Sequence, residues 1–279
     1  RDVITGFLAR GRESGTDGIM NTIWFDVCEE LLSLNYYGIA YGGAAGWEED
    51  PVDTEAFDRA FAWVFHGDRD GEIMAGYDAL LEAQLKGEEM MRHNTVQLFW
   101  IDPFQREWSA RIAEWQPTLR VMRLAAEEAM DVFLRGKRGN LRNADVLDDL
   151  LLAARRFDYA GLKLIYGAEM SRMYREAVAS GDRQRISFLD IQLGGAPKAC
   201  QGRIYDLIYG AANLKSQYRD VWDKQFKPYN EEGVLALFDM EIQRYWRKKW
   251  DIEKAIDVFR KTGEAPEPES IGFYVEGKK

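Results

Sequence analysis

The sequence contains few cysteines and histidines, two residue types that often form catalytic and metal sites. Its 279 residues include two cysteines, Cys28 and Cys200, and two histidines, His66 and His93. The cysteines lie far apart in the chain, and we interpret both as buried free thiols rather than as a structural disulfide. With no G-x-S-x-G motif, a Ser-His or Cys-His triad is not predicted. Glu89 and His93 stand four residues apart, but the sequence around them supplies no third ligand, so no metal site is predicted.

Basic residues are outnumbered by acidic residues. The 37 Lys and Arg residues face 47 Asp and Glu residues, which gives a net charge of −10 at pH 7. A nucleic-acid-binding protein presents a basic face, so this balance argues against nucleic acid as a partner. No run approaches the roughly 18 apolar residues of a membrane helix, so no membrane segment is predicted. Neither a GxGxxG nor a GxxxxGK[ST] motif is present, and no cofactor is predicted. The composition favours no particular compartment.

One stretch near the start of the chain differs from the rest. Residues 19–25 form a short run that is apolar on both faces, which is typical of a buried strand. The run leads to Trp24 and Asp26, and positions two apart point to the same side of a strand. The segment over residues 36–47 is rich in small residues and predicts a helix that packs closely on that strand. An amphipathic helix is predicted over residues 2–14, and helix, buried strand and helix in this order are typical of a parallel α/β barrel or sheet.

This stretch resembles a known family. Residues 15–47, GTDGIMNTIWFDVCEELLSLNYYGIAYGGAAGW, resemble the last strand and helix of the catalytic barrel in glycoside hydrolase family 20, the β-N-acetylhexosaminidases and their relatives. Residues 205–230, YDLIYGAANLKSQYRDVWDKQFKPYN, are similar to the helical tail that follows the barrel in some bacterial members. The resemblance implies that Trp24 walls the pocket for the N-acetyl sugar and that Asp26 or Glu29 bonds sugar hydroxyls. It implies an N-acetylhexosamine-containing glycan as the substrate.

The same resemblance implies a retaining, substrate-assisted hydrolysis, in which the acetamido oxygen of the sugar attacks the anomeric carbon while a Glu protonates the leaving oxygen. The family's catalytic pair is an adjacent Asp-Glu at the end of an earlier barrel strand. No Asp-Glu dipeptide occurs in this sequence, and Glu49-Asp50 has the reverse order and follows a predicted helix. We therefore expect no catalytic residue in this chain. The chain is predicted to be the C-terminal portion of a larger hydrolase, inactive by itself, with the missing barrel portion in the same protein or in a separate chain.

The predicted fold is mainly α. Residues 1–50 are expected to form the last β/α unit of a (β/α)8 TIM barrel, and Pro51 marks the boundary to an all-α C-terminal domain over residues 51–279. For residues 95–101 the pattern leaves open whether the segment is a strand or a buried connection. The apolar spacing then predicts long antiparallel helices joined by short loops. Their predicted ranges are 118–135, 143–178, 204–226 and 231–261.

Several of these features also have a purely structural interpretation. Trp24 and Asp26 are equally typical of a residue that covers a core and a residue that caps the next helix. The aromatic cluster at Trp100, Phe104, Trp108 and Trp115 is interpreted as core, with a sugar-stacking platform as the alternative. The basic residues at positions 244 and 247–249 share a predicted helix with Glu241, Asp251 and Glu253, and are interpreted as a solvated, ion-paired face. The alternative function is a free-standing helical protein-interaction module without catalytic activity, which would leave the predicted strand without neighbours.

Overall fold

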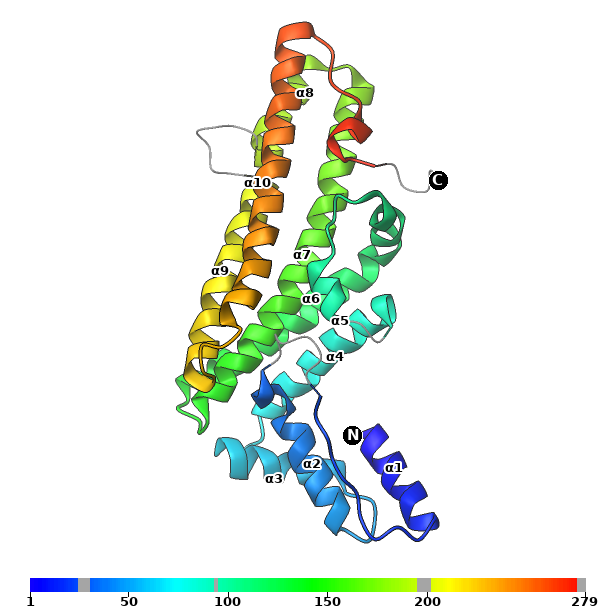
Figure 1. Ribbon diagram of the computed structural model, residues 1–279, viewed down its shortest axis with the longest axis vertical. Coiled ribbons are helices and arrows are strands. Elements are labelled where there is room, and N and C mark those ends of the chain that lie inside the picture. Colours follow the sequence, from blue (N-terminus) through cyan, green and yellow to red (C-terminus); the bar gives the residue numbers. More distant parts are fainter. Residues whose placement is uncertain (25–30, 93–94, 195–201, 275–279) are drawn as a thin grey trace.

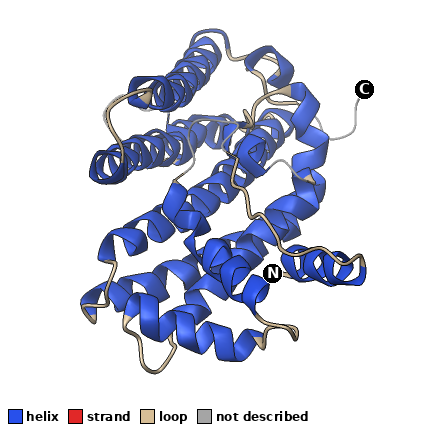
Figure 2. Cartoon of the chain, turned by 60° about the horizontal axis from the view of Figure 1, so that its bottom comes forward, coloured by secondary structure: helices blue, strands red, loops and turns tan. Residues whose placement is uncertain are grey.

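The computed structural model describes residues 1–24, 31–92, 95–194 and 202–274, and this part of the chain is all-α, with no strand in it (Figure 2). The N-terminal elements are α1 (Asp2–Glu13), the short helix η1 (Leu32–Asn35) and α2 (Tyr36–Trp47). They are followed by α3 (Thr54–Phe61), a π-helical turn η2 (Ala62–His66), α4 (Ile73–Met91) and α5 (Thr95–Trp100). Four long helices follow, α6 (Arg106–Arg138), α7 (Ala144–Ser180), α9 (Arg203–Gln225) and α10 (Glu231–Thr262). The remaining short elements are α8 (Arg183–Leu189), η3 (Asp190–Gly194) and η4 (Pro268–Ile271).

Helix α7 is the axis of the molecule. It packs against α6 on one side and α9 on the other, and α10 packs against α9. Figure 1 shows α7, α9 and α10 running side by side along the long axis, while α4 and α6 lie against the lower half of α7. At about 1.5 Å per residue, the 37 residues of α7 span roughly 55 Å. The predicted antiparallel long helices are confirmed, except that the first of them begins at Arg106 rather than at residue 118.

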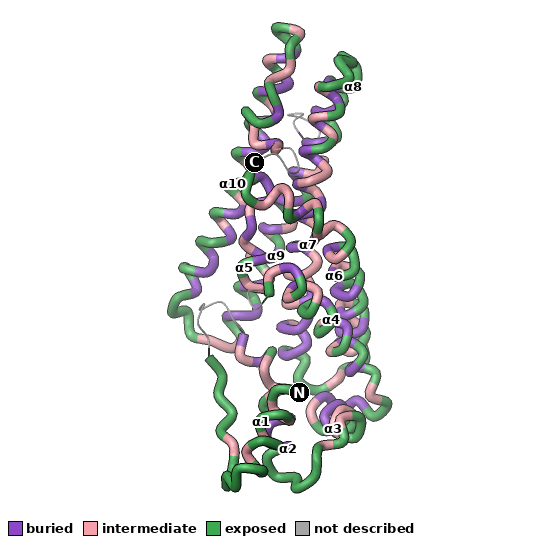
Figure 3. The backbone as a smooth tube through the Cα atoms, turned by 90° about the vertical axis from the view of Figure 1, so that its right-hand side faces the viewer, coloured by how far each residue is buried: buried purple, intermediate pink, exposed green. Residues whose placement is uncertain are grey.

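Two hydrophobic clusters stabilise this arrangement. The larger cluster joins α7, α9 and α10 and includes Tyr174, Tyr218 and Phe238. The smaller cluster lies between α3, α4, the second half of α6 and the first half of α7, with Phe133 at its centre. Buried residues recur along α7 from Val146 to Ala177 (Figure 3). Because one helix contributes to both clusters, the described helices from α3 to α10 form one packed body, which we call the helical body.

Local sequence sets the helix ends. Asp53 caps α3, and its side chain accepts a hydrogen bond from the backbone N–H of Ala56 at 3.1 Å. Helix α7 ends at Gly181 and α10 ends at Gly263, both with positive φ angles of 63° and 77°. Pro117 lies inside α6 without ending it. The long helices are therefore bounded by the capping chemistry visible in the sequence.

The predicted buried strand is wrong for the residues that the structure describes. Residues 16–24 form an extended segment without strand pairing, and apart from half-buried Ile19 these residues are exposed. A strand needs a neighbour to satisfy its backbone hydrogen bonds, and the described residues provide none. The helices predicted over residues 2–14 and 36–47 are confirmed as α1 and α2. The segment left open at residues 95–101 is helix α5.

Candidate functional site

The structure describes one of the three residues expected to contact the sugar. Trp24 ends the described part of the extended segment, and its side chain is 78% exposed. Its indole Nε1 donates a hydrogen bond to Thr22 Oγ1 at 3.2 Å. Asp26 and Glu29 lie outside the described residues. The expected pairing of Trp24 with an acidic side chain therefore stays a prediction, while the indole ring itself is open to solvent.

Helix α2 receives the extended segment on a face of small residues. A Cβ atom added at Gly42 would lie 1.7 Å from Asn21 Nδ2, and one added at Gly46 would lie 3.3 Å from the Cγ2 atom of Ile19. Glycine at these positions therefore lets the segment approach the helix backbone closely. The prediction that the small residues of this helix allow close packing of the preceding segment is confirmed, although that segment is not a paired strand.

Helix α1 is attached to α2 through polar contacts. Thr5 Oγ1 and Tyr41 Oη lie 3.0 Å apart and share a hydrogen bond, and Arg12 donates to the backbone carbonyl of Ala45 at 3.1 Å. None of the residues of α1 is buried. On its apolar face, Ile4 and Leu8 are half-buried, while Val3 and Phe7 stay exposed.

The exposed apolar side chains of α1 and the extended segment are the most unusual feature of the surface. We call them the N-terminal apolar residues; they are Val3 (82% exposed), Phe7 (69%), Met20 (84%), Ile23 (37%) and Trp24 (78%). Burying one such side chain fully contributes about 1.5–3 kcal/mol. Single exposed apolar residues are common on proteins, but this concentration within the first 24 residues is typical of a surface that another element covers.

A buried carboxylate joins the N-terminal elements to the helical body. Asp149 on α7 is fully buried, and its Oδ2 accepts hydrogen bonds from Ser33 Oγ of η1 and from the Gln225 amide at the end of α9. Its Oδ1 has no hydrogen-bond partner in the described part of the chain. Burial raises the pKa of Asp149, the two donors lower it, and the nearby charges of Asp145 and Asp148 raise it again, so that the net pKa is about 6. The side chain thus ties three separate segments together.

A second contact fixes α2 on α3. The Tyr37 hydroxyl donates to Asp58 Oδ1 at 2.5 Å, and Arg1 pairs with Asp58 at 2.9 Å. Burial raises the pKa of the Tyr37 hydroxyl, and the Asp58 carboxylate raises it further. The Tyr37 ring also packs edge-on against Phe57 and Phe61, with ring centroids 5.5 and 5.1 Å away. These contacts, together with Asp149, hold η1 and α2 rigidly on the helical body.

Two adjoining cavities of about 300 Å³ each are lined by residues of η1, α4 and α7. Both are lined by Leu34, Gln84, Ala153 and Phe157. Their walls are mostly apolar, and Asp78 is the single carboxylate among the lining residues of the two. Ordinary glycoside hydrolysis uses a pair of carboxyl groups, so these cavities do not have the composition of a complete hydrolytic site.

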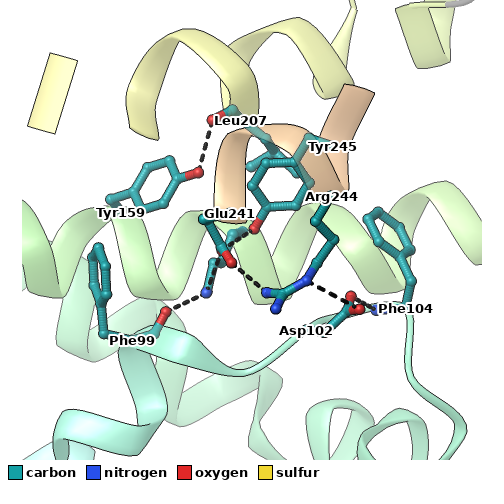
Figure 4. A network of polar contacts seen from close by, with 9 residues as sticks. Phe99, Asp102, Phe104, Tyr159, Leu207, Glu241, Arg244 and Tyr245 are labelled. Carbon is teal, nitrogen blue, oxygen red and sulfur yellow. Dashed lines mark hydrogen bonds and ion pairs between the residues drawn. The ribbon is translucent and has the colours of Figure 1, made fainter. Parts of the chain in front are cut away.

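The helical body also contains a buried ionic network. Lys163 Nζ donates to Glu241 Oε1 at 2.7 Å and to the backbone carbonyl of Phe99, and Tyr245 donates to the same Glu241 oxygen at 2.5 Å. The other Glu241 oxygen accepts from Arg244, which also pairs with Asp102 at 3.3 Å. Figure 4 shows Glu241, Arg244 and Asp102 in line between α10 and the connection that follows α5.

This network is suited to holding helices together rather than to proton transfer. Lys163 is fully buried, and burial lowers its pKa while the Glu241 carboxylate raises it. Both Glu241 oxygens already accept hydrogen bonds from neighbouring donors. A buried pair of this kind requires its partners, because removing one member leaves an uncompensated charge in the core.

Sequence reasoning missed Ser33, Asp149, Lys163 and Glu241. Asp149 falls among Val146, Leu150 and Leu152, and Lys163 stands between Leu162 and Leu164. A charged residue within the apolar stripe of a predicted helix was the signal available for both. Spacing alone did not identify their partners, because Ser33 and Glu241 lie on other elements, far away in sequence.

Two further properties of the described residues concern metal binding and membrane-spanning helices. No group of three or more His, Cys, Asp or Glu side chains there is arranged to hold a metal ion. Within the same residues, no helix has the length and apolar composition needed to cross a membrane. Comparison of the chain with protein-family models, curated proteins and solved structures finds no match.

Proposed function

We propose that the chain is the C-terminal portion of a β-N-acetylhexosaminidase-like glycoside hydrolase. The observation that carries the proposal is the uncovered set of N-terminal apolar residues, which belongs to a helix and an extended segment followed by a glycine-rich helix. This is the order of elements in the last unit of a (β/α)8 barrel. The N-terminal apolar residues are then covered by the preceding barrel elements, in the same protein or in a separate chain.

The extended segment fits this role because it has apolar side chains but no strand neighbours among the described residues. A preceding strand and a first barrel strand would supply the missing backbone hydrogen bonds on its two sides. Helix α2 already lies against the segment, with Gly42 at the closest approach. In this proposal residues 19–25 become a strand only when the barrel closes around them.

In the assembled enzyme Trp24 forms a wall of the N-acetyl sugar pocket, and Asp26 or Glu29 bonds sugar hydroxyls. The acetamido oxygen of the substrate attacks the anomeric carbon, and a Glu outside this chain protonates the leaving oxygen. The adjacent Asp of the family's catalytic pair also lies outside this chain. Water then opens the cyclic intermediate, which gives net retention of configuration. The helical body anchors the last barrel unit through Ser33, Asp149 and Tyr37.

Hydrolysis of 4-nitrophenyl N-acetyl-β-glucosaminide by the natural full-length gene product tests the proposal, with Trp24→Ala as the informative variant. Loss of the indole wall is expected to lower kcat/KM by about tenfold, which corresponds to about 1.4 kcal/mol of lost transition-state binding. Trp47→Ala is the matched control, because Trp47 is 90% exposed on the same N-terminal elements but lies at the far end of α2. The control is expected to keep kcat/KM within about twofold.

The intact mass of the natural product separates this proposal from the alternative. A mass well above 32.2 kDa together with activity that depends on Trp24 supports the hydrolase. A natural product of 32.2 kDa without a co-purifying chain and without glycosidase activity contradicts it. That second result favours a helical interaction module, whose contact surface would be the N-terminal apolar residues.

A further inference from the structure

The basic side of α10 differs from the solvated, ion-paired face that its sequence predicts. Arg244, Arg247 and Lys248 lie within one helical turn of each other, and Lys248 is only 8% exposed. Asp251 follows Lys248 by three residues, yet no ion pair joins Lys248 to a carboxylate in the described part of the chain. A buried cation without a paired carboxylate requires a physical explanation.

Lys248 is enclosed by rings and by backbone. Its Nζ lies 4.5 Å from the ring centroid of Phe104 and 5.1 Å from that of Phe273, and it donates to the carbonyl of Ile271 at 2.6 Å. An ammonium group has three donors, and this carbonyl accepts from one of them. Burial lowers the pKa of Lys248, and the more distant Asp251 and Asp102 raise it. Lys248 is also one of the residues that line the adjacent cavity.

That cavity has a volume of about 370 Å³ and lies between α10 and the connection at residues 102–104. Two carboxylates, Asp102 and Asp251, line this cavity. Asp102 is already occupied, because its Oδ1 accepts from the backbone N–H of Phe104 at 2.9 Å and its Oδ2 pairs with Arg244. Arg247 is exposed at the rim and makes no hydrogen bond or ion pair with any described residue. The positive charges of Arg247 and Lys248 thus face the cavity with Asp251 as the one nearby acid that is not engaged.

We propose that this cavity binds a small tetrahedral oxyanion of the phosphate type. Lys248 supplies a fixed, largely dehydrated charge at the back of the cavity, where an oxyanion would accept its remaining N–H donors. Arg247 supplies a planar guanidinium fork at the mouth, a geometry that matches two oxygens of one phosphate group. The site is separate from the N-terminal residues of the proposed hydrolase, and its existence does not depend on that function.

Titration calorimetry of the full chain with inorganic phosphate, at constant ionic strength maintained with sodium chloride, tests the proposal. Saturable binding is expected, and Arg247→Gln is expected to weaken it by about tenfold, as the loss of a charge-assisted contact implies. Lys248→Met keeps an apolar stem between the two rings and is expected to abolish binding. Lys254→Gln is the matched control, because Lys254 is an exposed cation on the same helix without a described partner and does not line the cavity.

The thermal unfolding midpoint provides a second measurement, because a ligand that binds the folded state raises it. Phosphate is expected to raise the midpoint of the wild type and of Lys254→Gln but not that of Lys248→Met, whose folding is checked by its own cooperative transition. Methyl phosphate in place of inorganic phosphate shows whether the group is recognised free or carried on a larger molecule. Absence of saturable binding, or equal binding by wild type and Arg247→Gln, overturns the proposal.

Discussion

Replacing Asp149 by Asn is expected to stabilise the protein at neutral pH. The folded-state pKa of Asp149 is raised from 3.8 to about 6, because the carboxylate is buried and lies near two other acids. A raised folded pKa means that the unfolded chain releases this proton more readily than the folded chain does. The contribution of Asp149 to stability is therefore greatest below about pH 3.8, falls as the pH rises toward about 6, and is lost above it.

The size of the effect follows from the shift. A difference of about two pKa units corresponds to at most about 3 kcal/mol, since each unit is about 1.4 kcal/mol. An Asn at this position accepts from Ser33 and Gln225 as the carboxylate does, but its amide places an unpaired donor where Oδ1 now lies. That donor costs about 1 kcal/mol or more. We therefore expect Asp149→Asn to gain about 1–2 kcal/mol at pH 7.5, with little gain near pH 4.

Urea unfolding followed by far-UV circular dichroism across this pH range measures the effect. The difference between variant and wild type is the relevant quantity, because the other titrating groups cancel in it. Asp148→Asn is the matched control on the adjacent residue. The pKa of Asp148 is lowered by the Lys137 and Lys224 ammonium groups despite partial burial, so its contribution is present above about pH 3.8 and is lost as the pH falls through its lower folded pKa.

The two neighbouring substitutions should therefore act in opposite directions at neutral pH. Asp148 is 22% exposed, so the loss in its variant is expected to stay below about 1 kcal/mol. Destabilisation by Asp149→Asn at pH 7.5, with an unchanged pH dependence between about pH 4 and 6, would refute the reasoning. It would mean that the donors from Ser33 and Gln225 stabilise the ionised carboxylate by more than burial destabilises it.

Further predictions concern the helical body and can be measured by the same urea unfolding. Lys163→Met leaves Glu241 buried without its ammonium partner and is expected to lower the free energy of unfolding by about 3–5 kcal/mol. The double variant Lys163→Met/Glu241→Leu should recover most of that loss. Equal losses in the single and the double variant would argue against a paired buried charge. Gly210→Ala places a Cβ 2.6 Å from the buried Tyr159 ring and is expected to cost about 1–3 kcal/mol. Gly43→Ala meets nothing within 4 Å inside α2 and should instead gain about 0.5–1 kcal/mol, so a loss there would show that α2 is packed against something else.

The long helices could be predicted because their stability depends on a local pattern. Apolar residues recur along α7 at helical spacing, and Asp53, Gly181 and Gly263 carry the capping chemistry that bounds α3, α7 and α10. Residues 19–25 have an equally clear apolar pattern. A strand, however, is stable only beside neighbouring strands, and the local sequence pattern does not show whether such strands are present. The short apolar run at Thr95–Trp100 is likewise compatible with either state, and its packing against α4 and α7 decides for helix.

The candidate sites likewise include residues that the sequence identified and residues whose environment only the structure shows. Trp24 was identified from the sequence, and its exposure agrees with a residue available for contact, but its role remains a proposal. Arg247 and Lys248 were interpreted as one solvated face, and the structure separates them by burial. The Phe104 and Phe273 rings that enclose Lys248 lie far apart in the sequence. No local rule connects residues so far apart.

By itself, the sequence determined most of the long helices, the net negative charge and the unusual character of the first 50 residues. These properties depend on side-chain chemistry within a few turns of backbone. The tertiary structure decided which charged residues are buried away from solvent. Asp149, Lys163 and Lys248 carry the same charges as their exposed neighbours, and only the packing of distant helices around them shifts their pKa values and selects their partners.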